Sequence, residues 1–378
     1  MRSVSEKRMQ RTVALICATL FVAFSFTYIS LYKAPLLEAL YDHVATGKLD
    51  YNPYIAATII TATLTTLAIW LNRLLKFQRE WTALAYLPSC ILLAFITDIN
   101  RGIYTNEGDL LPWLFIFLSV VLFNLLISFI LRRILFAKIK DYNLESNRLV
   151  WRNMVIFALM FMLTGFLSDG EKDFNYESAA YVEYKHGNID AALNVAKDCS
   201  SASQELTASR AFYLALQNKM GDNLFNYPQH FASGGLLLPV QRTTPLSPDS
   251  IYAILGIERK SKETVFECLQ RNVRNDSVPN IVKDYYLCAL LLEKRILQFK
   301  EELSHYYNIE NVDSLPTHYK EALLLYNYVV NDGEQIVDTT LQHKFDAMRI
   351  LSKQGNRMKK SSADEELRRT YWWYYLYE

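Results

Sequence analysis

Five long uncharged apolar runs lie within the first 168 residues, and no comparable run follows in the rest of this 378-residue chain. A helix needs about 20 apolar residues to cross the hydrocarbon core of a bilayer. We therefore expect a transmembrane domain at 1–168 and a soluble domain at 169–378, with the change between Ser168 and Asp169. The expected spans are residues 12–32, 51–72, 81–97, 110–131 and 153–168.

The orientation follows from the lysine and arginine residues near these runs. Thirteen lie before the first run, between the second and third runs, or between the fourth and fifth runs. Only four lie between the first and second runs, between the third and fourth runs, or just after the fifth run. Cytoplasmic loops carry the excess of positive charge, so we expect a cytoplasmic N-terminus and an extracytoplasmic C-terminal domain. The short run 153–168 decides this topology. If it lies flat on the membrane, the C-terminal domain becomes cytoplasmic.

The interiors of the five runs favour a structural role. None contains Asp, Glu, Lys, Arg or His, whereas transporters place ionisable side chains in mid-membrane, so transport is disfavoured. We expect Thr58, Thr61 and Thr65 to form hydrogen bonds between helices. Pro88 is expected to kink the third span.

Acidic residues between the runs leave an alternative hypothesis open. Glu38 and Asp42 are spaced to share one helix face, and Asp98 follows the third run. Membrane glycosyltransferases that use lipid-linked donors place catalytic acids in such outer loops. The alternative is therefore a glycosyltransferase-like enzyme, but no catalytic motif supports it, and an enzyme is the less favoured interpretation.

The part after Asp169 has the spacing of short paired helices throughout. The pairs recur at roughly 30–40 residues, close to the period of tetratricopeptide repeats. We therefore predict an all-α protein whose soluble domain is an α-solenoid-like, tetratricopeptide-like array, although an irregular helical domain remains open. The Pro- and Gly-containing segment 226–247 is expected to be a crossover that packs through its leucines, and Ser261 is expected to cap a helix.

Charge and motifs exclude several functions. Residues 169–378 carry 24 basic and 29 acidic residues, which argues against nucleic-acid binding. The six histidines and five cysteines show no metal-ligand spacing, so we expect no metal site, no cofactor and no structural disulfide. The cysteines are expected to be small buried side chains.

The last helix is the least ordinary soluble segment, because aromatic side chains surround it on every side. It anchors a partner, contacts the membrane interface, where Trp and Tyr are favoured, or packs as the end of the helical array. Packing is favoured, but a fully aromatic circumference suggests that part of it meets a second surface. The partner-binding candidates are Tyr371, Trp372, Trp373, Tyr374 and Tyr375.

Two stretches carry a resemblance to a known group of proteins. Residues 211–216 read AFYLAL and lead to Gly221 and the pair 224–225, and residues 370–375 read TYWWYY. With the overall layout, these stretches resemble an uncharacterised family of bacterial multi-span membrane proteins with a tetratricopeptide-like C-terminal domain. The resemblance implies the bacterial inner membrane and no known activity. We expect an extracytoplasmic scaffold that binds a protein or peptide partner.

Overall fold

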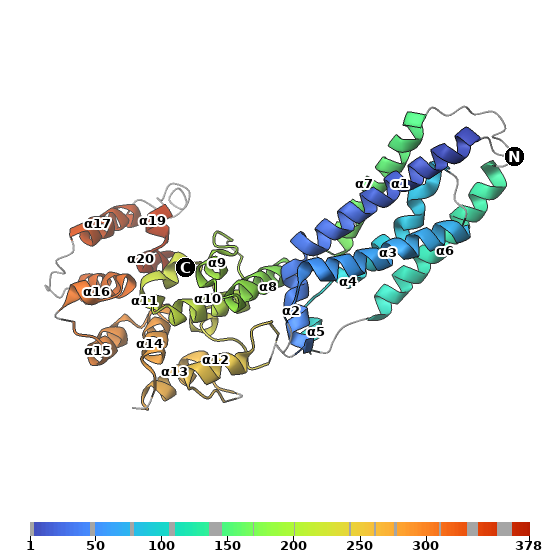
Figure 1. The fold of residues 1–378 in the computed structure, drawn as a ribbon. Helices are drawn as coiled ribbons and strands as arrows, with labels where there is room; N and C mark the ends of the chain where they lie inside the picture. Colours follow the sequence, from blue (N-terminus) through green and yellow to red (C-terminus); the bar gives the residue numbers. More distant parts are fainter. Residues whose placement is uncertain are drawn as a thin grey trace. The chain divides into compact units, whose positions relative to one another are not determined.

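All the regular secondary structure in the part of the chain that the structure, a computed structural model, describes is helical (Figure 1). No strand occurs among those residues, so the predicted all-α class is confirmed. The chain divides into two compact units, Met1–Ser178 and Ala179–Glu378. Asp169, the expected first residue of the soluble domain, lies outside the described residues. These are 4–45, 50–75, 79–105, 110–135, 146–168, 170–199, 201–241, 243–260, 262–275, 278–309, 311–330, 339–353 and 365–378.

The N-terminal unit has a helix at each of the five apolar runs. Its α-helices are α1 (Val4–Thr27), α2 (Ala34–Ala45), α3 (Pro53–Leu75), α4 (Leu87–Thr97), α5 (Gly102–Thr105), α6 (Leu110–Leu135) and α7 (Ser146–Leu167), with a π-helical turn η1 (Tyr28–Tyr32) after α1 and a 3-10 helix η2 (Arg79–Tyr86) before α4.

Among the residues that the structure describes, three helices are long and apolar enough to cross a membrane by length and composition. They are Arg11–Tyr32, Pro53–Leu74 and Arg148–Leu167, and shorter apolar segments run over Trp81–Thr97 and Trp113–Phe123. The fifth run thus belongs to a longer helix than its apolar residues alone indicate. Polar residues from Ser146 onward extend α7 in the N-terminal direction.

The third run is divided where the sequence predicted a kinked helix. The 3-10 helix η2 covers its first part, with a non-helical backbone at Trp81, and α4 begins only at Leu87. Pro88 therefore lies in the first turn of α4 and not in the interior of a helix. A proline in this turn costs no hydrogen bond, because the first backbone N–H groups of a helix have no intrahelical acceptor.

The threonines of α3 do not join helices as expected. The Oγ1 atoms of Thr58 and Thr65 donate to carbonyl oxygens one turn earlier in α3, each at 2.7 Å. The bond between helices comes instead from α4, where Ser89 Oγ donates to the carbonyl of Leu64 at 2.9 Å. Asn153 of α7 similarly accepts from the backbone N–H of Ala83 at 2.9 Å. Two polar side chains outside the threonine face therefore hold this packing.

The C-terminal unit consists of short helices in succession, with α8 containing the boundary between the units. Its helices are α8 (Lys172–Lys185), α9 (Ile189–Asn194), α10 (Gln204–Leu216), α11 (Met220–Asn223), α12 (Pro248–Leu255), α13 (Val265–Val273), α14 (Asn280–Leu292), α15 (Ile296–Tyr306), α16 (Thr317–Val330), α17 (Thr339–Lys353), α19 (Glu365–Arg368) and α20 (Tyr371–Tyr377), and short 3-10 turns η3 (Leu224–Asn226), η4 (Ala232–Gly235) and η5 (Val312–Ser314) join some of them.

Helix α14 is the centre of this unit. It contacts α10, α11, α13 and α15, while α16 packs against α11, α15 and α20. The segment 226–247 returns to this core, because Leu236, Leu237 and Leu238 are buried. The expected inward packing of that segment is confirmed.

The start of α13 differs from the prediction. Ser261, the expected cap, lies outside the described residues, and the helix begins at Val265. Thr264 caps it by accepting from the backbone N–H of Glu267 at 3.2 Å. The Glu267 carboxylate accepts from the N–H of Thr264 at 2.9 Å, which completes a reciprocal capping box.

Candidate functional site

The aromatic helix α20 begins at a threonine cap and fills the core of the C-terminal unit. Thr370 Oγ1 accepts from the backbone N–H of Trp373 at 3.3 Å. Tyr371 and Trp372 are fully buried, Trp373 and Tyr374 are almost so, and Tyr375 is half-buried. Four of the five partner-binding candidates therefore lie mostly inside the chain.

Helix α16 fixes α20 through one residue. Glu321 is buried, and its Oε2 atom accepts from the backbone N–H of Tyr371 at 2.7 Å. Its backbone carbonyl accepts from Nε1 of Trp372 at 2.6 Å. The Nδ1 atom of the buried His318 lies 2.9 Å from the same Oε2. Because buried polar groups must be satisfied, these bonds fix both the depth and the rotation of α20.

Other elements surround the rest of the aromatic helix. Tyr374 donates to the carbonyl of Leu292 at the end of α14 at 2.7 Å. The ring of Phe225 packs on Tyr371 and Tyr374, with centroid separations of 5.2 and 5.3 Å. Phe345 of α17 packs on Trp372 at 5.0 Å. The circumference that suggested a second surface is thus shared among several helices of the same unit.

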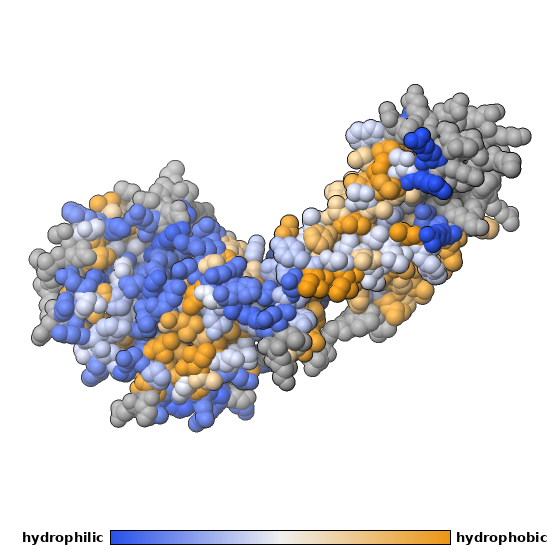
Figure 2. All heavy atoms as spheres, viewed as in Figure 1, coloured by the Kyte–Doolittle hydropathy of each residue, from blue (hydrophilic) through white to orange (hydrophobic). Residues whose placement is uncertain are grey.

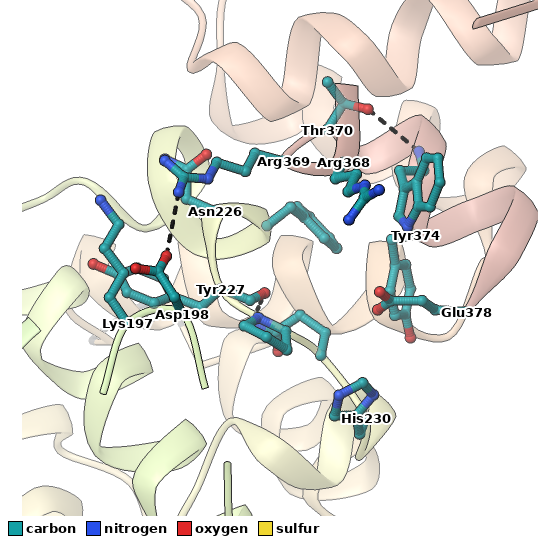
Figure 3. A pocket seen from close by; sticks show the side chains of 14 residues that line it. Lys197, Asp198, Asn226, Tyr227, His230, Arg368, Arg369, Thr370, Tyr374 and Glu378 are labelled. Atoms are coloured by element: carbon teal, nitrogen blue, oxygen red, sulfur yellow. Dashed lines mark hydrogen bonds and ion pairs between the residues drawn. The ribbon is translucent and has the colours of Figure 1, made fainter. Parts of the chain in front are cut away.

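A hollow of about 690 Å³ opens beside α20 (Figure 3). Three segments that are distant in the sequence form its walls: the turn after α9, the chain after η3, and the end of α19 with α20. The lining residues are Lys197, Asp198, Phe225, Asn226, Tyr227, Pro228, Gln229, His230, Arg368, Arg369, Thr370, Trp373, Tyr374 and Glu378.

The walls of the hollow combine charge with aromatic surface. Arg369 Nη2 lies 3.4 Å from Oδ1 of the exposed Asp198, and this ion pair joins the two far walls. The guanidinium of Arg368 lies over the Trp373 ring, 5.9 Å from its centroid. Figure 3 shows Lys197 beside Asp198 and Glu378 on the side of Tyr374. Such a mixture suits a ligand that carries both charged and apolar groups.

A buried cation lies directly behind one wall. Arg210 of α10 is 2% exposed, and its guanidinium lies 5.1 Å from the ring centroid of Tyr227. Its Nη2 atom donates to the carbonyls of Val195 and Ala196, at 2.8 and 2.6 Å. These bonds fix the turn that carries Lys197 into the hollow. Burial lowers the pKa of Arg210, yet an arginine keeps its charge in a protein.

Tyr227 lines the hollow and packs its ring against the Arg210 guanidinium. Burial raises the pKa of its phenol, while Arg210 and Arg369 act in the opposite direction. The ring is therefore a neutral aromatic plate at neutral pH, with a guanidinium against it.

The acids of the enzyme hypothesis lie in the N-terminal unit. Glu38, which is buried, and Asp42 lie one turn apart on α2. Oδ2 of Asp98 accepts from Nε1 of Trp113 at 3.0 Å, which ties the end of α4 to α6. The hydroxyl of Tyr104 in α5 donates to the carbonyl of Ala39 at 3.4 Å, so the two expected outer loops are in contact. A catalytic role for these acids stays a prediction.

Metal-ligating residues do not gather in groups of three or more among the residues that the structure describes. Cys17, Cys90, Cys268 and Cys288 are buried and Cys199 is half-buried, each as a free thiol. Burial raises the pKa of Cys268, so this thiol is a poor nucleophile at neutral pH.

Sequence reasoning found the aromatic helix but missed the hollow beside it. Lys197 and Arg368 are far apart in the chain and belong to no motif. One signal was present: Arg210 lies in the otherwise uncharged stretch TASRAFYLAL, and a charge on a buried face requires a partner. What the arginine binds could be known only from the folded turn after α9.

These features define an all-helical protein with apolar helices in its N-terminal unit and a charged, aromatic hollow in its C-terminal unit. The chain belongs to a family of unknown function, DUF6057, whose family model matches residues 99–283 and 258–378. The match includes every residue that lines the hollow, and the expectation of an uncharacterised family is confirmed. None of the curated proteins matches the chain, and none of the solved structures does.

Proposed function

We propose that this protein is a five-span protein of the bacterial inner membrane that displays a peptide- or protein-binding domain outside the cytoplasm. The domain is a tetratricopeptide-like array of helix pairs, and the hollow beside α20 receives the partner. The observation that carries the proposal is this hollow of about 690 Å³, because its size and its mixture of charged and aromatic walls suit a short peptide segment.

Exposed apolar side chains on the N-terminal unit support the membrane location. Phe166 of α7 is 82% exposed, and Leu15 of α1 is 70% exposed. Figure 2 shows hydrophobic side chains over much of the visible surface of the N-terminal helices. In water such surface is an aggregation hazard, whereas lipid tails cover it without cost.

The charge distribution supports the orientation. The thirteen lysine and arginine residues of one side lie before the first apolar run, between the second and third runs, or between the fourth and fifth runs. The length of α7 matters most, because the side of the membrane on which the C-terminal unit lies depends on whether the fifth run crosses. Twenty residues, Arg148–Leu167, are enough to cross a bilayer.

A site-specific photocrosslinking experiment tests the binding function. A photoreactive amino acid replaces His230 at the rim of the hollow, and in a control chain it replaces the exposed Glu301 of α15. The crosslinked proteins are identified by mass spectrometry in intact cells. We expect one partner at position 230 that is not captured at position 301.

A second variant makes the result specific to the hollow. Asp198→Trp adds bulk to the opening without removing a positive charge, so it blocks a ligand by volume. We expect it to abolish the crosslink at position 230 while the protein remains folded and in the membrane. The same adducts at both positions, or adducts at position 230 that Asp198→Trp leaves unchanged, would show that the hollow is not the binding site.

A further inference from the structure

An open groove lies in the N-terminal unit between α7 and the end of α1 with its π-helical turn η1. The two helices pack side by side (Figure 1), and the groove has a volume of about 490 Å³. Four aromatic residues and two small ones line it, and the described lining includes no charged side chain: Phe24, Thr27, Tyr28, Tyr32, Gly165 and Phe166. An apolar concavity of this size is a candidate ligand site.

The π-helical turn aligns three of the rings along one wall. Side chains four residues apart in an α-helix drift by about 40° around its axis, so three rings at this spacing would diverge. The backbone N–H of Lys33 donates to the carbonyl of Tyr28 at 2.9 Å, and this wider turn reverses part of the drift. The ring of Tyr28 stacks on Phe24 at 5.4 Å and on Tyr32 at 5.5 Å. The wall is therefore a continuous aromatic strip.

The opposite wall is open at Gly165. A Cβ atom added there would have no neighbour within 4 Å. Membrane helices approach one another through small residues on both surfaces, whereas the exposed rings of Tyr32 and Phe166 project at the edges of this groove. A thin flexible chain fits between these rings better than a second helix does.

Polarity changes along the groove in the way it does along a phospholipid. Phe24 is at the apolar end, and at the other end the hydroxyls of Tyr28 and Ser168 are hydrogen-bonded to each other. Nζ of Lys33 donates to the carbonyl of Ser168 at 2.6 Å and lies 5.5 Å from the ring centroid of Tyr32. Phe24 and Tyr32 are eight residues apart, which is about 12 Å along a helix and most of one leaflet of about 15 Å.

We propose that this groove binds a phospholipid, with one acyl chain along the aromatic strip and the head group at the Tyr32 end. Methylene groups of the chain pack on the rings and over Gly165, and the Tyr32 hydroxyl bonds the ester or phosphate oxygens. Tyrosine suits this position because its ring is apolar and its hydroxyl stays at the polar interface. This inference rests on the proposed membrane location and adds a ligand to it.

A photoactivatable lipid tests the proposal. The full chain is reconstituted in nanodiscs that contain phosphatidylethanolamine with a diazirine in the middle of one acyl chain. After irradiation, mass spectrometry compares adducts on residues 24–32 with adducts on Leu118 and Leu122, which are exposed on α6. We expect the groove segment to carry the larger share, because a bound chain stays there longer than the lipids that cover α6.

Two variants of α7 assign the effect to the groove. Gly165→Leu fills the open wall without a clash and should lower the ratio of groove to α6 adducts about tenfold, the effect of displacing two methylene groups. Ala158→Leu adds bulk at an exposed position of the same helix outside the groove and should leave the ratio unchanged. Equal ratios in the two variants would overturn the lipid site.

A photoreactive amino acid in place of Phe166 identifies the occupant from the protein side. A phospholipid adduct is expected, and a crosslinked pair of chains would overturn the proposal in favour of a second copy. The pattern of lipid adducts also separates this inference from the proposed function. Adducts on α6 without enrichment in the groove would overturn the lipid site alone, whereas no adducts on either segment would overturn the membrane location as well.

Discussion

Glu321 joins α16 to α20 in the core of the C-terminal unit. Its carboxylate is bonded to the backbone of Tyr371 and to His318, and its carbonyl to Trp372. In the sequence it is one acid in the stretch THYKEALLLY and shows no sign of being buried. A single buried carboxylate therefore joins two helices that lie 50 residues apart.

Substitution of this residue gives the first prediction. Glu321→Ala leaves the N–H of Tyr371 and the ring of His318 without an acceptor in a dry core, so we expect a loss of about 3 kcal/mol of stability. Chemical denaturation of the C-terminal unit, followed by tryptophan fluorescence in the intact chain, measures this loss. Glu301→Ala, at an exposed position of α15, should change stability by less than about 0.5 kcal/mol. Equal losses of stability in Glu321→Ala and Glu301→Ala would contradict the role of Glu321 in joining α16 to α20.

The second prediction concerns pH and the ion pair of Glu263 with Arg271. Two bonds of 2.7 and 2.8 Å join their side chains, and the hydrogen bonds from Arg271 lower the pKa of Glu263 to about 2. A carboxylate whose pKa is lowered on folding contributes stability above its ordinary pKa of 4.5 and loses that contribution as the pH falls toward 2.

Glu263→Gln should therefore be less stable than the wild type at pH 6, by about 1 kcal/mol at most because Arg271 is partly exposed. The difference should shrink as the pH falls from 4.5 toward 2, where the wild-type carboxyl becomes neutral as well. Thermal unfolding midpoints across this range measure it. A difference that is constant with pH would show that charge is not the cause.

At the scale of elements, the approach of α11 to α16 depends on a glycine. A Cβ atom added to Gly221 would lie 2.7 Å from Cβ of Pro316 and 2.9 Å from Cζ of Tyr319. Gly221→Ala should therefore push the two helices apart and cost about 1–3 kcal/mol. Gly234→Ala is the matched control, because its nearest neighbour would lie at an ordinary 3.6 Å. Thermal unfolding compares them, and equal midpoints would contradict the close contact.

The aromatic helix provides a fourth prediction. Removal of residues 371–378 takes two fully buried side chains out of the core, so we expect the C-terminal unit to lose its resistance to limited proteolysis. Leu376→Ser, at a position 46% exposed, should leave the digestion pattern unchanged. A truncated chain that keeps its resistance and loses only its partner would favour an anchor over a packing role for α20.

Sequence patterns predicted helices better than the contacts between them. The helical spacing after Asp169 correctly indicated a succession of short helices, because this signal is local. The division of the third run before Leu87 and the hydrogen bonds of the α3 threonines within their own helix were missed, since both depend on contacts that periodicity does not identify. The hollow was missed for the same reason: its walls are joined by a pair, Asp198 and Arg369, that are 171 residues apart.

At the scale of the whole molecule, the fifth prediction is the topology. Reporter fusions at residues 45 and 378 should both indicate the extracytoplasmic side, and fusions at residues 76 and 140 the cytoplasmic side. The physical reason is the distribution of basic residues around the five runs. Cytoplasmic signals at both 140 and 378 would show that α7 does not cross, and would place the hollow inside the cell.

The ion pair between Asp198 and Arg369 also bears on the order in which the unit folds. Closing a loop of this length costs chain entropy that local helix contacts do not incur, so contacts between such distant segments form late. We therefore expect the hollow to be among the last features to be completed, so that a chain that is still folding does not present it. A ligand that binds only there recognises the finished domain and protects it from unfolding by mass action.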